Sequence, residues 1–149
     1  MASNAAALPR ALRRRQQADR TFRRWTIAWL GGSVLGIANG VIRETACKDR
    51  VGDLTAAQIS AATLVVFLAL YFWVLERRWP LNTTRRALEI GTAWVILTVL
   101  FEFGFGRHAD RKSWSELFAN YNLAGGNLWL LVLAWIGIGP AAIRAVRHR

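Results

Sequence analysis

Four long apolar blocks, separated by basic segments, constrain the fold of this chain more than any other feature. They cover residues 25–42, 54–75, 87–106 and 128–146. Each is close to the ~20 residues that a helix needs to cross the hydrocarbon core of a bilayer. Apolar residues fill the blocks continuously, without the alternation that is typical of a barrel strand. The blocks therefore predict an all-α integral membrane protein, a bundle of four membrane-spanning helices.

A bundle of buried helices in a water-soluble protein is the alternative interpretation of these blocks. Helices of such a bundle each carry a polar face, and the four blocks have none. Hydrophobic residues also make up 54% of the 149 residues, eight tryptophans among them, and the mean hydropathy is +0.22. A soluble domain is rarely so apolar. The composition therefore favours the membrane.

The basic residues divide unequally between the two ends of the predicted spans. Of the 20 lysines and arginines, 14 lie in residues 1–24, in the segment between the second and third blocks, and in the tail. The positive-inside rule then predicts that both termini lie in the cytoplasm. Because the basic N-terminal residues lead directly into the first span, we interpret them as a cytoplasmic anchor and not as a mitochondrial presequence, and we expect a bacterial inner-membrane protein. Residues 1–24 form a basic cytoplasmic arm, followed by a four-span domain over 25–149. Anionic lipid headgroups are the expected partner of this charge, and nucleic acid is not.

Glycines recur at every fourth position of the first block, at Gly32, Gly36 and Gly40. These positions share one helix face, and the absence of side chains lets another helix approach closely. We expect this face to pack against another span of the same chain or against a second copy.

Polar residues gather at the ends of the spans that are predicted to face outward. An ionised carboxylate within a span is costly, so we expect Glu102 to face the bundle, to find a partner or to take up a proton. By depth, Arg43 is the first candidate and Arg107 the second. The cluster is either a buried pair that joins helices or a binding site for a small polar molecule, a proton or a lipid headgroup. Its candidate residues are Asn39, Arg43, Glu44, Gln58, Glu102, Arg107, Asn120 and Tyr121.

A short amphipathic helix is predicted before the fourth span, at the outer membrane surface. Ser113 and Glu116 have the spacing of a capping box. An apolar stripe follows at helical spacing, formed by Trp114, Leu117, Phe118 and Tyr121.

Two further local patterns carry predictions. Glu89 follows Arg85 and Arg86 by four and three residues, which predicts salt bridges on one helix face. Pro140 lies inside the fourth block and predicts a kink there.

The sequence carries no recognisable catalytic or metal-binding pattern. Cys47 is the single cysteine, and His108 and His148 lie at opposite ends of the predicted spans. Nucleotide-binding and hydrolase motifs are absent. We therefore expect no catalytic residue, no metal and no cofactor.

Four polar segments carry a resemblance to a known class of proteins: Asn39–Glu44, Gln58–Ser60, Phe101–Arg107 and Asn120–Trp129. Their order along the chain is similar to that in small bacterial four-span membrane proteins. The resemblance covers most of the chain from Trp25 on. It implies the four-span fold and no particular activity.

These observations leave three functional hypotheses. The first is a non-catalytic accessory or assembly subunit of a larger membrane complex, bound to another membrane protein or to itself. The second is a small transporter or channel, in which Asn39, Arg43, Gln58 and Glu102 line a polar path. Because four spans rarely enclose a pore, this hypothesis requires self-association. The third is an enzyme that acts on a lipid headgroup.

Overall fold

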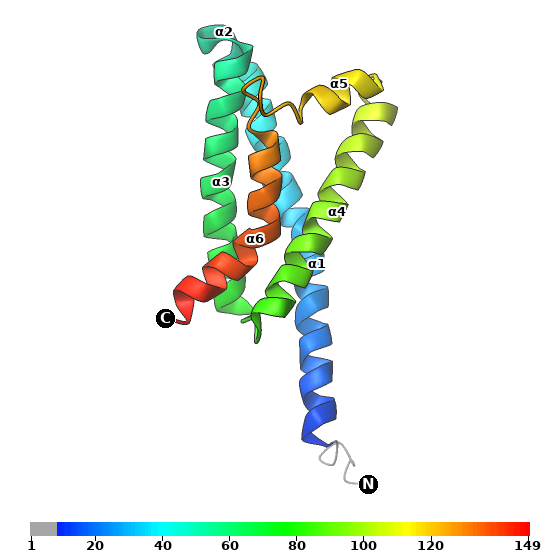
Figure 1. Cartoon of the computed structure of the whole chain (residues 1–149), viewed down its shortest axis with the longest axis vertical. Coiled ribbons are helices and arrows are strands. Elements are labelled where there is room, and N and C mark those ends of the chain that lie inside the picture. Colours follow the sequence, from blue (N-terminus) through cyan, green and yellow to red (C-terminus); the bar gives the residue numbers. More distant parts are fainter. Residues whose placement is uncertain (1–8) are drawn as a thin grey trace.

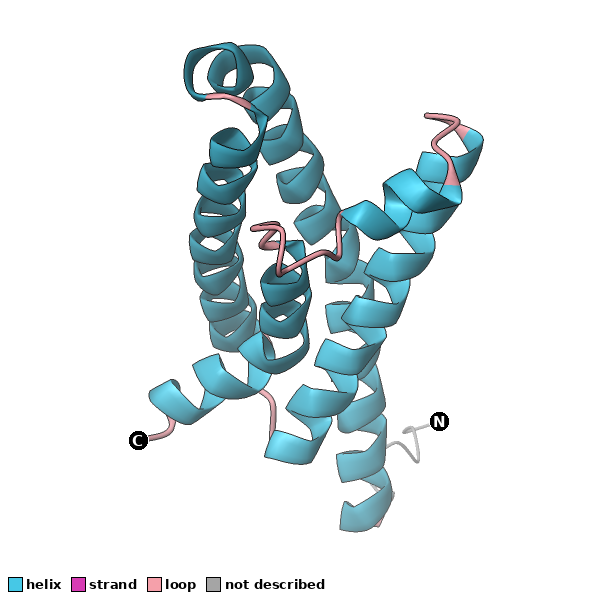
Figure 2. Cartoon of the chain, turned by 45° about the horizontal axis from the view of Figure 1, so that its top comes forward, coloured by secondary structure: helices cyan, strands magenta, loops and turns pink. Residues whose placement is uncertain are grey.

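The computed structural model describes residues 9–149, which form helices and no strands (Figure 2). The helices are α1 (Arg10–Ile42), α2 (Lys48–Val51), α3 (Asp53–Arg78), α4 (Thr84–His108), α5 (Trp114–Ala119) and α6 (Trp129–Arg147). A π-helical segment, Arg43–Cys47, joins α1 to α2. Four helices are long and apolar enough to cross a membrane, which confirms the four predicted apolar helices.

The first helix is longer than its apolar block. It begins at Arg10, so the predicted boundary after residue 24 lies within a continuous helix. No glycine or proline interrupts residues 10–30, and the arginine-rich part extends the helix beyond the other three (Figure 1). The first eight residues of the predicted arm lie outside the described residues.

The long helices form a ring in which α1 contacts α3, α3 contacts α6, α6 contacts α4, and α4 contacts α1. The contact between α4 and α6 is the most extensive. There, a β-carbon added at Gly91 would overlap the backbone carbonyl of Gly137, so the two helices meet backbone to backbone. Toward the end of the molecule that carries α5, α1 and α4 diverge (Figures 1 and 2). We call this the α5 end, and the opposite one the terminal end.

Three aromatic side chains fill the middle of the ring. Trp25, Phe72 and Trp94 are each at most 1% exposed, and their ring centroids lie 5.2–6.4 Å apart. The indole of Trp94 donates to the Trp25 carbonyl at 2.9 Å, and that of Trp25 donates to the Trp79 carbonyl at 3.0 Å. Because their polar atoms are paired, these rings form a dense core that joins α1, α3 and α4.

A buried corner lies at the terminal end, between α3 and α4. The carboxylate of Glu76 is fully buried and accepts the backbone N–H of Leu81 at 3.1 Å. Its other oxygen lies 3.2 Å from Nε2 of His148. From α6, Arg144 donates to the Leu81 carbonyl at 2.8 Å and to the Asn82 carbonyl at 3.0 Å. The end of α6 is thus bonded to the α3–α4 connection.

Two local predictions can be followed in the structure. Glu89 pairs with Arg85 at 3.1 Å and with Arg86 at 3.0 Å, which confirms both salt bridges. Pro140 lies inside α6, and the ribbon of α6 bends in its C-terminal half (Figure 1).

Candidate functional site

A cleft of about 640 Å³ lies where α1 and α4 diverge, and residues of α3 and α6 line it as well. Its floor, nearest the middle of the ring, is apolar and aromatic. Trp29, Leu64, Leu68, Trp94 and Ile136 form this floor. The volume lies within the ~300–1,000 Å³ that is typical of small-molecule sites.

The glycine face of α1 lines this cleft and is only partly covered. A β-carbon added at Gly32 would meet the Trp94 ring at 2.8 Å, so this glycine does allow close packing. One added at Gly36 or at Gly40 would meet nothing within 4 Å. Within the described chain, therefore, only the first of the three predicted packing glycines contacts another helix. The other two leave the wall of the cleft bare.

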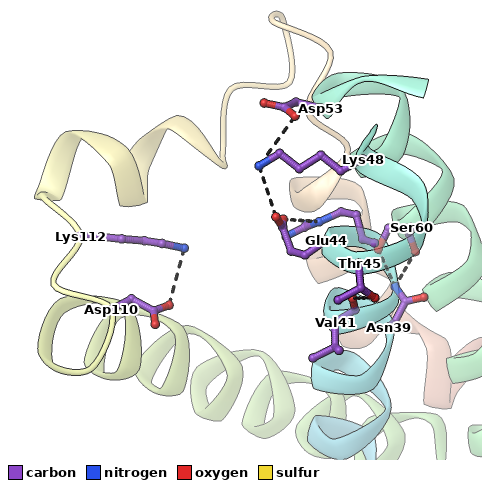
Figure 3. A network of polar contacts seen from close by, with 10 residues as sticks. Asn39, Val41, Glu44, Thr45, Lys48, Asp53, Ser60, Asp110 and Lys112 are labelled. Atoms are coloured by element: carbon purple, nitrogen blue, oxygen red, sulfur yellow. Dashed lines mark hydrogen bonds and ion pairs between the residues drawn. The ribbon is translucent and has the colours of Figure 1, made fainter. Parts of the chain in front are cut away.

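The mouth of the cleft, at the α5 end, carries charges of both signs on two facing sides. On the α1–α3 side, Arg43 pairs with Glu44 at 3.1 Å, and Lys48 pairs with Glu44 at 3.3 Å and with Asp53 at 3.8 Å. On the α4 side, Lys112 pairs with Asp110 at 3.8 Å. The ammonium groups of Lys48 and Lys112 point toward each other across the mouth (Figure 3).

The π-helical segment helps to position the first of these sides. Arg43 and Glu44 are its first two residues, and both line the cleft. π-Helical segments occur mostly as single wider turns inside α-helices, and they are frequent at functional sites. Gly52, with a φ of 84°, then allows the tight turn that brings Asp53 beside Lys48.

Between the floor and the mouth, Asn39 joins two walls of the cleft. Its buried amide donates to the backbone carbonyl of Ser60 at 2.8 Å and to the Ser60 hydroxyl at 2.7 Å (Figure 3). These bonds hold α1 against α3 at the level where Gly36 and Gly40 are bare. The fixed wall preserves the space beside them.

The carboxylate of Glu102 lines the cleft from α4, and its partners differ from the expected ones. Tyr121 donates its hydroxyl at 2.7 Å and Trp129 its indole N–H at 2.8 Å, both to Oε2. No residue in 9–149 donates to Oε1. Arg43 pairs with Glu44 instead, and Arg107 donates to the Lys112 carbonyl at 3.2 Å. Glu102 is thus held by neutral donors, with one oxygen unused.

Helix α5 supports this arrangement from the α5 end. Ser113 and Glu116 form the predicted capping box, with both reciprocal bonds present. The bond from the Ser113 backbone lowers the pKa of the exposed Glu116 carboxyl. The ring of Phe103 lies against Trp114, Phe118 and Tyr121, with centroids 5.4–6.1 Å apart. Burial, and then the bond to Glu102, raise the pKa of Tyr121, so its hydroxyl stays protonated and keeps donating.

The structure brings together most of the residues that the sequence indicated. Five of the eight candidates line the cleft, namely Asn39, Arg43, Glu44, Glu102 and Asn120. The other three candidates do not line the cleft. Tyr121 donates to Glu102, which does line it. Gln58 donates to the Gly126 carbonyl at 3.1 Å, and Arg107 lies near the Trp114 ring. Sequence reasoning missed four charged residues of the mouth: Lys48, Asp53, Asp110 and Lys112. The available signal was their position in the sequence: all four lie in the short polar segments that follow the first and third apolar blocks.

The remaining polar candidates add no metal centre. Cys47 is a half-buried free thiol next to the mouth. Within residues 9–149, no three histidine, cysteine or acidic residues are close enough to hold a metal ion. The polar and charged side chains that line the cleft can exchange hydrogen bonds and ion pairs with a guest molecule.

Comparison with protein-family models, with curated proteins and with solved structures finds no match for this chain.

Proposed function

We propose that this chain is a non-catalytic, multi-pass protein of the bacterial inner membrane that binds an amphipathic molecule of the bilayer in its cleft. Both termini are cytoplasmic in this proposal. Three basic segments support that orientation: the start of α1, the end of α3 together with the start of α4, and the chain from Arg144 on. All three lie at the terminal end (Figure 1), and together they carry 14 of the 20 lysines and arginines.

The observation that carries the proposal is the bare wall at Gly36 and Gly40. A bilayer offers no water to fill such a space between helices, and an empty one forfeits dispersion contacts. An acyl chain against the glycines and the aromatic floor restores those contacts. The charged mouth then lies at the height of the headgroups. A molecule with one apolar and one polar end matches both parts of the cleft.

A transport path through the molecule fits the geometry less well. Trp25, Phe72 and Trp94 close the ring below the cleft, and each is at most 1% exposed. A bound molecule therefore enters and leaves from the α5 side or sideways from the bilayer. This supports a holding or presenting role over conduction.

An accessory subunit of a larger complex is the second candidate, and the same glycines favour it. Small residues recur where membrane helices pack closely, so a helix of a partner protein, or of a second copy, can occupy the wall at Gly36 and Gly40. The two candidates differ in what fills the cleft, a lipid-like molecule or a protein helix.

Thermal unfolding of the delipidated protein with and without added mixed phospholipid tests the binding proposal. A ligand at about 100 times its Kd stabilises the native state by about 2.7 kcal/mol. For a chain of this size that corresponds to a rise in Tm of roughly 5–10 °C. We expect this rise in the wild type and its loss in Gly36→Leu, because the leucine side chain occupies the bare wall against which the acyl chain lies.

Gly104→Leu is the matched control, since Gly104 also has open space around it but does not line the cleft. It should keep the wild-type rise in Tm. An equal rise in Gly36→Leu, or none in the wild type, would contradict the proposal.

A further inference from the structure

The charges of the cleft mouth narrow the chemistry of the guest. Three cations line the cleft, Arg43, Lys48 and Lys112, together with four carboxylates, Glu44, Asp53, Asp110 and Glu102. A headgroup that carries only negative charge would meet the cations but leave four carboxylates opposed to it. A headgroup with both signs can pair with each set.

The ion pairs of the mouth can open at little cost, so that their charged groups can pair with a headgroup instead. The pairs of the mouth are 3.1–3.8 Å long and their side chains are at least 38% exposed. Solvent-exposed pairs contribute little stability, roughly 0–1 kcal/mol each, so replacing one partner by a ligand group costs little. A phosphate between Lys48 and Lys112 would lie where these two ammonium groups already point toward each other (Figure 3).

The unused oxygen of Glu102 indicates a donor on the guest. Tyr121 and Trp129 both donate to Oε2, which fixes the carboxylate and leaves Oε1 available on the cleft wall. A primary ammonium supplies three N–H donors and a positive charge, whereas a quaternary ammonium has no N–H donor. Glu102 therefore discriminates between two zwitterionic headgroups that differ only in this respect.

Resting on the proposed function, we propose that the guest of the cleft is a zwitterionic phospholipid with a primary ammonium, of the phosphatidylethanolamine class. Its acyl chain lies along Gly36 and Gly40 and its phosphate lies between Lys48 and Lys112. The ethanolamine turns back from the phosphate into the cleft, so that its ammonium lies among the carboxylates, with Glu102 as the deepest acceptor. The apolar floor and the charged mouth follow the order of acyl chain and headgroup in such a lipid.

The test is lipid retention from vesicles of defined composition. The full chain is reconstituted into vesicles with equal amounts of phosphatidylethanolamine, phosphatidylglycerol and phosphatidylcholine that share the same acyl chains. It is then extracted in mild detergent, and the lipids that remain bound are counted by mass spectrometry. Because a hydrogen bond to a charged group contributes about 1.5–3 kcal/mol, we expect phosphatidylethanolamine to be enriched about tenfold over phosphatidylcholine.

Four variants separate the elements of this proposal. Gly36→Leu should remove the bound lipid, and Gly104→Leu should retain it with unchanged selectivity. Glu102→Gln should lower the enrichment of phosphatidylethanolamine over phosphatidylcholine several-fold. Lys112→Gln should lower retention of all three lipids alike, because each carries a phosphate.

The outcomes distinguish the two proposals. Retained lipid that depends on Gly36 but has the composition of the vesicle, or is richest in phosphatidylglycerol or phosphatidylcholine, overturns the headgroup assignment and leaves the proposed function standing. Full enrichment in Glu102→Gln likewise overturns the headgroup assignment alone. Absence of retained lipid in the wild type, or equal retention in Gly36→Leu and Gly104→Leu, overturns both.

Discussion

Gly91→Ala should destabilise the protein more than any other single methyl group added to it. The new β-carbon would overlap the backbone carbonyl oxygen of Gly137, and both residues lie inside long helices. Neither helix can yield locally, because α4 and α6 make the most extensive contact of the fold. Overpacking of this kind costs typically 1–3 kcal/mol and sometimes more, and we expect a loss of about 3 kcal/mol. The measurement is the free energy of unfolding in mixed micelles of mild detergent and dodecyl sulfate.

The control for this prediction is Gly104→Ala in the same helix. Gly104 has nothing within 4 Å of an added β-carbon. Its replacement should be neutral or stabilising by up to about 1 kcal/mol, since alanine has the higher helix propensity. Equal unfolding free energies for the two variants would mean that α4 and α6 do not cross at Gly91 and Gly137.

Glu76→Ala should have the second largest effect, through the corner at the terminal end. The substitution leaves the buried N–H of Leu81 without its acceptor, and Leu81 itself is only 1% exposed. A buried donor without a partner costs about 1–3 kcal/mol, and the empty volume adds to this. We expect a loss of about 2–4 kcal/mol in the free energy of unfolding. The C-terminal residues should also become accessible to carboxypeptidase, because His148 loses its contact with Glu76.

Glu76→Gln separates the hydrogen bond from the charge. Glutamine keeps an acceptor for Leu81, so this variant should retain most of the stability that Glu76→Ala loses. If both variants have the same free energy of unfolding, the hydrogen bond to Leu81 does not stabilise the corner. The stabilising element is then the negative charge beside His148.

The helices themselves could be predicted because their signal is continuous and local. Each apolar block is long enough to specify a helix without reference to the rest of the chain. The capping box of Ser113 and Glu116 and the salt bridges of Glu89 also lie within four residues of sequence. Interactions of this range depend only on helix geometry, which the spacing already contains.

The partners of Glu102 could not be predicted because they depend on long-range packing. The sequence favoured Arg43, because it is the basic residue predicted to lie closest to Glu102 in membrane depth. The structure instead uses Tyr121 and Trp129, which are 19 and 27 residues away along the chain. Both are brought to Glu102 by the segment that turns back from α5 into α6. Nothing in the spacing of residues fixes that return path.

The burial of Glu76 and the presence of the cleft could not be predicted either, because both depend on long-range packing. Glu76 precedes Arg77 and Arg78 at the end of a span, a pattern that is typical of a solvated helix end, yet it is fully buried. The cleft exists because α4 leans on α6 at Gly91 and therefore diverges from α1. The angle at which two helices cross is determined by how their surfaces pack against each other. The hydrophobic periodicity of each helix alone does not reveal that angle.

The central claim, that the cleft holds an amphipathic molecule of the bilayer, is tested most directly by photocross-linking from a side chain that already lines it. A photoreactive leucine analogue replaces Ile37, which lines the cleft beside Gly36 and Gly40, in one variant, and Ile96, which is equally exposed but does not line the cleft, in another. Each protein is irradiated after purification in mild detergent. We predict a lipid adduct at position 37 and none at position 96, where detergent has replaced the bulk lipid. An adduct to another protein or to a second copy at position 37, or no lipid adduct there, would contradict the claim.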